Sequence, residues 1–285
     1  MGLAWGLSMP MTKLAVSTGH EHFGILIWQM VLVAILMGIP LALRPRTNGP
    51  RLRHLRLLLF VAFFGTMVPN SLSYIAAGEL PSGVMAIIMS LIPMFPLPIA
   101  LIWRLEVFEW KRLGGLIFGA VAMFVLIAPG TSLPNPSAAP FVLFAVVATI
   151  CYGLEGNYVA KFGLGGLDTI QVVFYSSLLG LLIIIPTALV TDQYYNPFAS
   201  FGVPEYALIV SSLGHGFAYA CLLWLIGRTG PVFAAQVSYI VTVAGVAFSI
   251  FLLGESYSGY IWLALALVMI GLFLVQPKVQ SVEQG

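Results

Sequence analysis

Long apolar runs separated by short polar interruptions fill this chain from end to end. About 20 consecutive apolar residues make a helix long enough to cross the hydrocarbon core of a bilayer. A transmembrane β-barrel would show segments of about ten residues that alternate between apolar and polar, and these runs do not alternate. The pattern predicts ten transmembrane helices, numbered segments 1 to 10, near residues 1–18, 23–43, 55–77, 82–104, 113–129, 138–160, 169–190, 205–226, 231–253 and 259–276.

Composition supports this interpretation. Of the 285 residues, 60% are hydrophobic and only 8% are charged, against about 25% charged residues in soluble domains. We therefore expect an all-α polytopic membrane protein that has the lipid bilayer as its surroundings. The net charge of +2 does not suggest a nucleic-acid partner. Cys151 and Cys221 both lie inside apolar runs, where we expect buried thiols rather than a disulfide. No basic stretch followed by a small-residue cleavage site opens the sequence, so a removable signal peptide is not expected.

Basic residues fall on one side of the membrane when the chain is threaded through ten segments. With the N-terminus in the cytoplasm, eleven of the twelve Lys and Arg residues lie in cytoplasmic loops or the tail, and only Lys13 lies within a segment. The opposite loops carry the acids Glu21, Glu79, Asp192 and Glu205. Short cytoplasmic loops of membrane proteins are enriched in Lys and Arg. The charges therefore predict that both termini are cytoplasmic, and they agree with the count of ten.

The two halves of the chain match weakly when one is shifted along the other. A shift of 149 positions places Glu106 on Glu255, Gly78 on Gly227 and Gly65 on Gly214, and a shift of 147 places Trp5-Gly6-Leu7 on Tyr152-Gly153-Leu154. We expect two repeats of five helices, at 1–129 and 138–276, and a short cytoplasmic tail at 277–285. Because five is odd, the second repeat must enter the membrane from the opposite side. Inverted repeats of this kind are typical of secondary transporters.

Several stretches also carry a family resemblance. The opening AWGLSMPMTKLA, the run SGVMAIIMSLIPMF that leads to Glu106, and the later LLGE before the last apolar segment resemble the EamA-type family of the drug/metabolite transporter superfamily. The resemblance covers essentially the whole chain. It implies a bacterial-type inner-membrane carrier, often an exporter of amino acids or other small metabolites. The sequence departs from the family pattern at Thr242, where a proline is expected, and at Leu105, which replaces the glycine before Glu106.

Three prolines interrupt segment 4. Pro93, Pro96 and Pro98 lie in an apolar run, and each interior proline removes a backbone donor and clashes with the preceding turn. In hydrocarbon such breaks occur only where protein or a watery cavity supplies partners. The shift of 149 places Gly245 opposite Pro96 and Thr242 opposite Pro93, which suggests a second weak point in segment 9. We expect segments 4 and 9 to line a translocation path, although a proline kink that only shapes packing would leave the same pattern.

Polar side chains occupy matching positions in segments 3 and 8. The shift of 149 places Asn70 on Tyr219, and Tyr74 and His215 lie close to them in the sequence. Such residues suit the wall of a substrate cavity. Hydrogen bonds that only join neighbouring helices would account for them equally well. Gln236 and Tyr239 of segment 9 are further candidates for the path.

Glu155 is the main titratable candidate within the membrane. It lies about 9 Å from the cytoplasmic end of segment 6, at 1.5 Å per residue, and its short stem reaches water poorly from that depth. We interpret it as a candidate to carry a proton or bind a cation. A carboxylate exposed in a cytoplasmic vestibule is the alternative.

Glu106 and Glu255 lie at the ends of segments 4 and 9, on opposite faces of the membrane. We expect each of these glutamates to cap the next helix and hold the hairpin that leads into it. This role is structural, with gating as the alternative.

The absence of catalytic motifs narrows the function. The sequence has no GxxxxGK[ST] for ATP binding, and no HExxH, GxSxG or paired intramembrane aspartates for catalysis. The leading hypothesis is a secondary transporter that moves a small organic solute by alternating access, without a cofactor or bound metal. An intramembrane enzyme and a channel-like protein are the alternatives. Protons are a candidate coupling ion, and the oligomeric state stays open.

Overall fold

The computed structural model describes residues 1–17, 21–45, 49–92, 94–105, 107–127, 133, 135–198 and 201–275. Within these ranges the chain consists of helices and connecting loops, without a strand. Glu106, Pro93 and the tail at 277–285 lie outside the described residues. The side chain of Pro96 is also not described.

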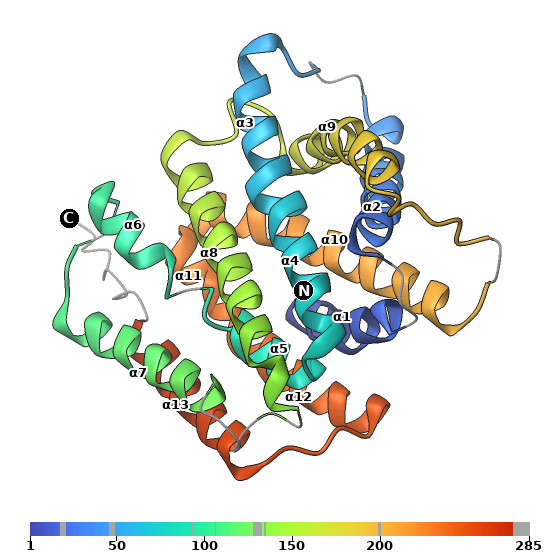
Figure 1. The fold of residues 1–285 in the computed structure, drawn as a ribbon. Coiled ribbons are helices and arrows are strands. Elements are labelled where there is room, and N and C mark those ends of the chain that lie inside the picture. The colour runs from blue at the N-terminus through green and yellow to red at the C-terminus, as the bar shows by residue number, and fades with distance from the viewer. Residues whose placement is uncertain are drawn as a thin grey trace, which may run out of the picture.

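The first half contains the helices of segments 1 to 5 (Figure 1). They are α1 (Gly2–Val16), α2 (His22–Leu43), a stretch made of η1 (Leu52–His54), α3 (Leu55–Phe60), η2 (Val61–Met67) and α4 (Val68–Glu79), then α5 (Ser82–Met89), α6 (Pro96–Ile102) and α7 (Trp110–Ile127). The η2 stretch is a π-helix, a form that often marks functional sites.

The second half contains the helices of segments 6 to 10. They are η3 (Pro136–Ala138) with α8 (Ala139–Phe162), α9 (Thr169–Val190), α10 (Val203–Thr229), α11 (Pro231–Ala234) with η4 (Ala235–Val237) and α12 (Ser238–Leu253), and α13 (Gly259–Val275).

Six of the described helical stretches are long and apolar enough to cross a membrane by length and composition, namely His22–Leu43, Leu52–Glu79, Trp110–Ile127, Pro136–Phe162, Thr169–Val190 and Val203–Thr229. The other four predicted segments form shorter or broken helices. Large apolar side chains point outward along the bundle, for example Phe124, Leu182 and Phe251, which are exposed by 74%, 71% and 82%. A surface of this kind suits contact with lipid rather than water.

The helices of the two halves run in opposite directions. Lys13, near the end of α1, donates hydrogen bonds to the carbonyl oxygens of Ala77 and Gly78 at the end of α4. Lys13 also lines a cavity with Asn135 and Ala138, which precede α8, so α8 starts at the end of the bundle where α1 finishes. We call this end the acidic face, because Glu79 and Glu255 line the same cavity. The opposite end, where α1 starts and α8 and α10 finish, is the basic face.

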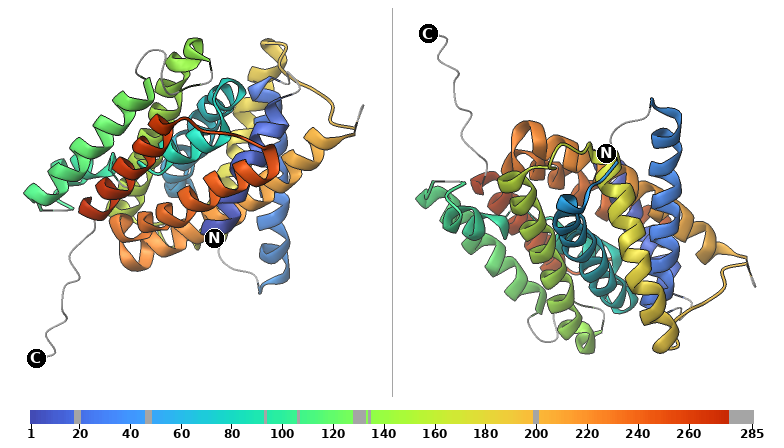
Figure 2. Two further views of the ribbon diagram at one scale, coloured as in Figure 1. Left: turned by 90° about the horizontal axis from the view of Figure 1, so that it is seen from below. Right: turned by 90° about the horizontal axis from the view of Figure 1, so that it is seen from above.

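The helix pairs obey the same inversion. An inverted repeat exchanges α1 with α8 and α4 with α10, so the packing of α1 on α10 has its image in the packing of α4 on α8. The pairs α2 with α9 and α7 with α13 are their own images, and they lie on opposite sides of the bundle (Figures 1 and 2). These contacts are those that two inverted five-helix repeats require.

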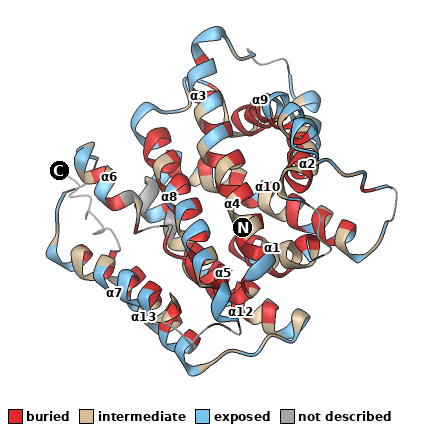
Figure 3. Ribbon diagram, viewed as in Figure 1, coloured by how far each residue is buried: buried red, intermediate tan, exposed pale blue. Residues whose placement is uncertain are grey.

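Segment 4 is broken, as its prolines predict. Helix α5 ends at Met89 and α6 begins at Pro96, where a missing backbone donor costs no helical hydrogen bond. All eight residues of α5 are buried, at the centre of the bundle (Figure 3). Ser90, Leu91 and Met94, which follow α5, are buried as well.

The weak point expected around Thr242 and Gly245 is absent, because both residues lie within the continuous helix α12. Segment 9 departs from the α-helix earlier, at Ala235–Val237. Gly245 serves packing instead, since a Cβ atom there would lie 2.6 Å from the Cβ of Ala86 in α5. The Thr242 hydroxyl donates a hydrogen bond to the backbone carbonyl of Ser238 in its own helix.

Close packing of α7 on α13 predicts a difference between two neighbouring glycines. A Cβ atom on Gly115 would lie 2.6 Å from the carbonyl oxygen of Gly271, and backbone cannot yield as a side chain can. At Gly114 the nearest atom would be 3.8 Å away, on the Leu274 side chain. We expect Gly115→Ala to lower stability by about 1–3 kcal/mol through overpacking. Gly114→Ala should leave stability unchanged or raise it slightly. Thermal unfolding of the purified protein in detergent measures both, and equal transitions for the two variants would contradict the packing.

Candidate functional site

Asn70 lies at the centre of a buried polar chain that joins three helices. Its side-chain nitrogen donates to Oε1 of Gln29 in α2 over 3.0 Å, and its oxygen accepts from the Tyr152 hydroxyl of α8 over 2.6 Å. All three side chains are buried. Because α4 supplies Asn70, this chain ties the first repeat to the second, with both ends of the Asn70 amide group paired.

Glu155 lies one turn further along α8 and is buried too, with 3% of its surface exposed. The Tyr219 hydroxyl of α10 donates to its Oε1 over 2.5 Å. Neither ion pair found among the described residues involves this carboxyl group. Gly65, in the π-helical stretch, makes room for the pair, because a Cβ atom there would lie 2.7 Å from Cδ of Glu155 and against the Tyr219 hydroxyl.

Aromatic rings connect the polar chain around Asn70 with the Glu155–Tyr219 pair. Trp5 of α1 meets Tyr152 edge to face, with ring centres 6.5 Å apart and planes at 89°. Trp5 also meets His215 edge to face at 5.7 Å, and His215 stacks on Tyr219 at 6.0 Å. Trp5 and Tyr152 were not among the predicted site residues. The alignment of the two repeats, which places one on the other, is the signal that could have found them.

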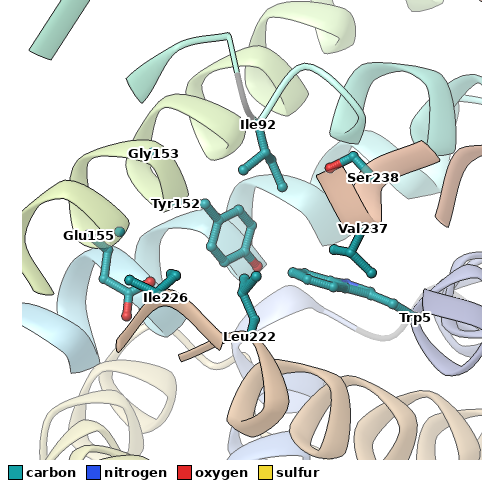
Figure 4. A pocket seen from close by; sticks show the side chains of 10 residues that line it. Trp5, Ile92, Tyr152, Gly153, Glu155, Leu222, Ile226, Val237 and Ser238 are labelled. Carbon is teal, nitrogen blue, oxygen red and sulfur yellow. The ribbon is translucent and has the colours of Figure 1, made fainter. Parts of the chain in front are cut away.

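Two cavities lie on either side of the Trp5–Tyr152 pair. The basic-side cavity, of about 30 Å³, is lined by Glu155, Leu222 and Ser238 among others (Figure 4). The acidic-side cavity, of about 40 Å³, is lined by Ser8, Asn70 and His215 among others. Both linings include Trp5 and Tyr152. A water needs about 10–15 Å³ measured in this way, so each cavity has room for a few waters and not for a metabolite.

The predicted path residues divide among these features. Asn70, Tyr74 and His215 line the acidic-side cavity, Glu155 lines the basic-side cavity, and Tyr219 holds Glu155. Gln236 in η4 and Tyr239 in α12 line neither cavity. Among the described residues, no group of three or more His, Cys, Asp or Glu side chains is placed to hold a metal ion.

Glu255 caps a helix, although not the one expected. Instead of the following α13, it caps α5 of the other repeat. Its Oε1 accepts from the backbone and hydroxyl of Ser82 over 2.8 and 2.9 Å, and its Oε2 accepts from the Gly83 backbone over 3.2 Å. Tyr257 donates to the same carboxylate, and burial together with this neighbour raises the pKa of Tyr257. The contact closes the acidic face between α5 and α12.

The tight fit at Gly65 predicts that a single methyl group will disturb the buried carboxyl. Gly65→Ala should push Glu155 and Tyr219 apart and lower stability by about 1–3 kcal/mol. Gly78→Ala in α4 is the matched control, since a Cβ atom there meets nothing within 4 Å. Thermal unfolding in detergent compares the two variants. If Gly65→Ala unfolds at the wild-type temperature, the close approach is not present in the protein.

Several known proteins are similar to this chain in sequence or in fold. The model of the EamA-like transporter family matches residues 1–128 and 139–276. A WAT1-related protein of Arabidopsis thaliana is 28% identical over an alignment of 301 residues, which covers 95% of this chain and 81% of the relative. The uncharacterized inner membrane transporter YedA of Escherichia coli K12 is 23% identical over 238 residues, which cover 80% of this chain and 74% of YedA.

A crystal structure of a protein aligns with a TM-score of 0.66 at 14% identity, over 95% of this chain and 94% of that one, and supports the fold alone. The family model covers both halves of the chain, each matching one five-helix repeat. The chain therefore belongs to the EamA-like transporter family.

Proposed function

We propose that this transporter moves a small organic solute, an amino acid or a related metabolite, out of the cell across the cytoplasmic membrane by alternating access. The inverted repeat supports the mechanism, because two structurally equivalent halves can exchange roles between an inward-open and an outward-open state. The similarity to YedA, an inner membrane transporter, supports the inner membrane as the location. The outward direction rests on the family resemblance.

The small size of the two central cavities is the main support for alternating access. Two spaces of about 30 and 40 Å³ are too small for a metabolite, so a solute can pass only if helices move. A channel would need a continuous open path instead, and the acidic face is closed by the cap that Glu255 places on α5. The arrangement favours a carrier over the channel alternative.

The distribution of charged residues indicates which face of the bundle is cytoplasmic. Arg44, Lys161 and Arg228 lie at or near the ends of α2, α8 and α10, on the basic face. Glu79, Asp192 and Glu255 lie at or after the ends of α4, α9 and α12, on the acidic face. We infer that the basic face is cytoplasmic, which places the first residue of α1 and the last of α13 on the cytoplasmic side.

Proton coupling is the finer part of the proposal, and Glu155 is its candidate. A carboxyl group inside the membrane without a cationic partner marks an ion or proton pathway more often than a structural contact. Tyr219 donates a hydrogen bond to this carboxyl group, and the basic-side cavity opens beside it. Gain or loss of a proton at Glu155 would change how strongly it holds Tyr219, and so couple α8 to α10.

Transport by Glu155→Gln tests the coupling. The substitution keeps the shape and removes the titration, so we expect solute flux to lose its dependence on a pH gradient while flux without a gradient persists. Proteoliposomes loaded with a mixed pool of amino acids and small metabolites, analysed by mass spectrometry, provide the measurement. Glu79→Gln, at the exposed acidic face, is the matched control and should retain coupling. A Glu155→Gln variant that responds to the gradient as the wild type does would exclude this residue as the proton carrier.

A further inference from the structure

The two central cavities share a wall that the inverted repeat maps onto itself. The shift of 147 places Trp5 on Tyr152, and these two rings are in contact. Two residues that a twofold operation exchanges, and that touch each other, lie at the axis of that operation. The Trp5–Tyr152 pair therefore marks the pseudo-symmetry centre of the transporter, where inverted-repeat carriers place their sites.

Several of the other lining residues follow the same operation. Glu155 and Ser238 of the basic-side cavity correspond to Ser8 and Met89, and both of these line the acidic-side cavity. Leu222 and Ile226 of the basic-side cavity correspond in the same way to Ser73 and Ala77. The two cavities therefore share a set of lining residues that the inverted repeat exchanges.

We propose that these cavities are the two halves of one substrate site, divided by Trp5 and Tyr152, and that a planar-ring solute without net negative charge parts the rings as it crosses. This inference rests on the proposed transport function and adds the site and the class of solute. The joined site opens to one face and then to the other, and the ring pair closes the path between its two halves in the state described here.

The charge of the lining sets the class of solute. Glu155 is the carboxyl group of the basic-side cavity, and Asn70 and Gln29 supply amide groups to the acidic-side cavity. Among the described residues, neither lining contains a Lys or Arg. Lys13, on the acidic face, is engaged with the carbonyl oxygens of Ala77 and Gly78. A carboxylate solute would meet no cation in either half, whereas an ammonium group would find a carboxylate and ring faces.

The aromatic rings at the cavities favour a solute with a flat ring. Trp5 and Tyr152 stand at 89° to each other, and His215 stands at 89° to Trp5 on the acidic side. Flat aromatic faces and edges of this kind contact another ring in stacked or edge-to-face geometry, which is favourable beyond the area buried. A solute with a planar ring can replace the contact that Trp5 and Tyr152 make with each other.

Thiol labelling tests the single site without knowledge of the solute. Ser8 and Ser238 each line one cavity, and Ser→Cys changes little in size. Each cysteine is introduced alone, with Cys151 and Cys221 replaced by Ala, in right-side-out and inside-out vesicles. A membrane-impermeant cationic methanethiosulfonate is then added outside. Because the joined site is exposed to each face in turn, we expect both cysteines to react from both faces. Asp192→Cys, exposed on the acidic face, is the control and should react from that face alone.

Labelling of each cysteine from its own face alone would overturn the proposal, because the cavities would then be separate. Failure of both cysteines to react from either face would overturn it as well. Neither result bears on whether the protein transports, which the loaded proteoliposomes measure independently. A wild type that exports no solute from the mixed pool would count against the proposed function, even where labelling from both faces upholds the single site.

A matched solute series tests the class. Phenylethylamine, phenylalanine and phenylpropionate share a ring and differ in charge, and the first two should be exported by the wild type at least about tenfold faster than the third. Trp5→Ala and Tyr152→Ala should raise the KM for the preferred solute about tenfold, and Trp110→Ala, exposed at the start of α7, should not. Export of phenylpropionate at the rate of phenylethylamine, or an unchanged KM in both ring variants, would overturn the assignment.

Discussion

A polar group inside hydrocarbon must find its partner within the protein, because leaving it unpaired costs several kcal/mol. This constraint explains why α5, which leads into the break in segment 4, is fully buried. It also explains why Asn70, Gln29 and Tyr152 form one chain, and why the Glu155 carboxyl group accepts from Tyr219. These polar side chains pair with one another at the centre of the bundle.

The inverted repeat also makes the centre of the bundle approximately symmetric. Helix contacts, cavity linings and the ring pair are all related by one approximate twofold operation, yet the chemistry of the two halves differs. One half carries Glu155 where the other carries Ser8, and one carries Leu222 where the other carries Ser73. In the proposed mechanism, equivalent shape allows the two faces to exchange roles, and a carboxyl group in only one half allows a proton gradient to drive the exchange in one direction.

Sequence periodicity predicted most of the fold, because span length and loop charge are imposed by the bilayer itself. The prolines likewise located the break in segment 4. Details that depend on packing were not accessible. Gly245 was expected to weaken segment 9 and instead lets α12 approach Ala86, and Glu255 was expected to cap α13 and instead caps α5 across the repeats. A local pattern shows that a glycine or a carboxylate is available, and the tertiary fold decides which helix it meets.

The site shows the same division. Asn70, Tyr74, Glu155 and His215 were predicted from their polarity in apolar segments, and the structure places all four in the cavity linings. Trp5 and Tyr152 are apolar enough to pass as ordinary residues of a membrane helix, so polarity could not reveal them. Their position on each other in the repeat alignment carried the information, and it became meaningful only when the two rings were seen in contact.

Alternating access at this centre is tested most directly by counterflow. Proteoliposomes are preloaded with unlabelled phenylalanine, diluted into a trace of labelled phenylalanine, and followed over time. A carrier that exposes one site to each face in turn must accumulate label transiently above equilibrium, and the rate must saturate with concentration. Uptake that rises linearly with concentration and never exceeds equilibrium would contradict alternating access, and would indicate an open path past Trp5 and Tyr152.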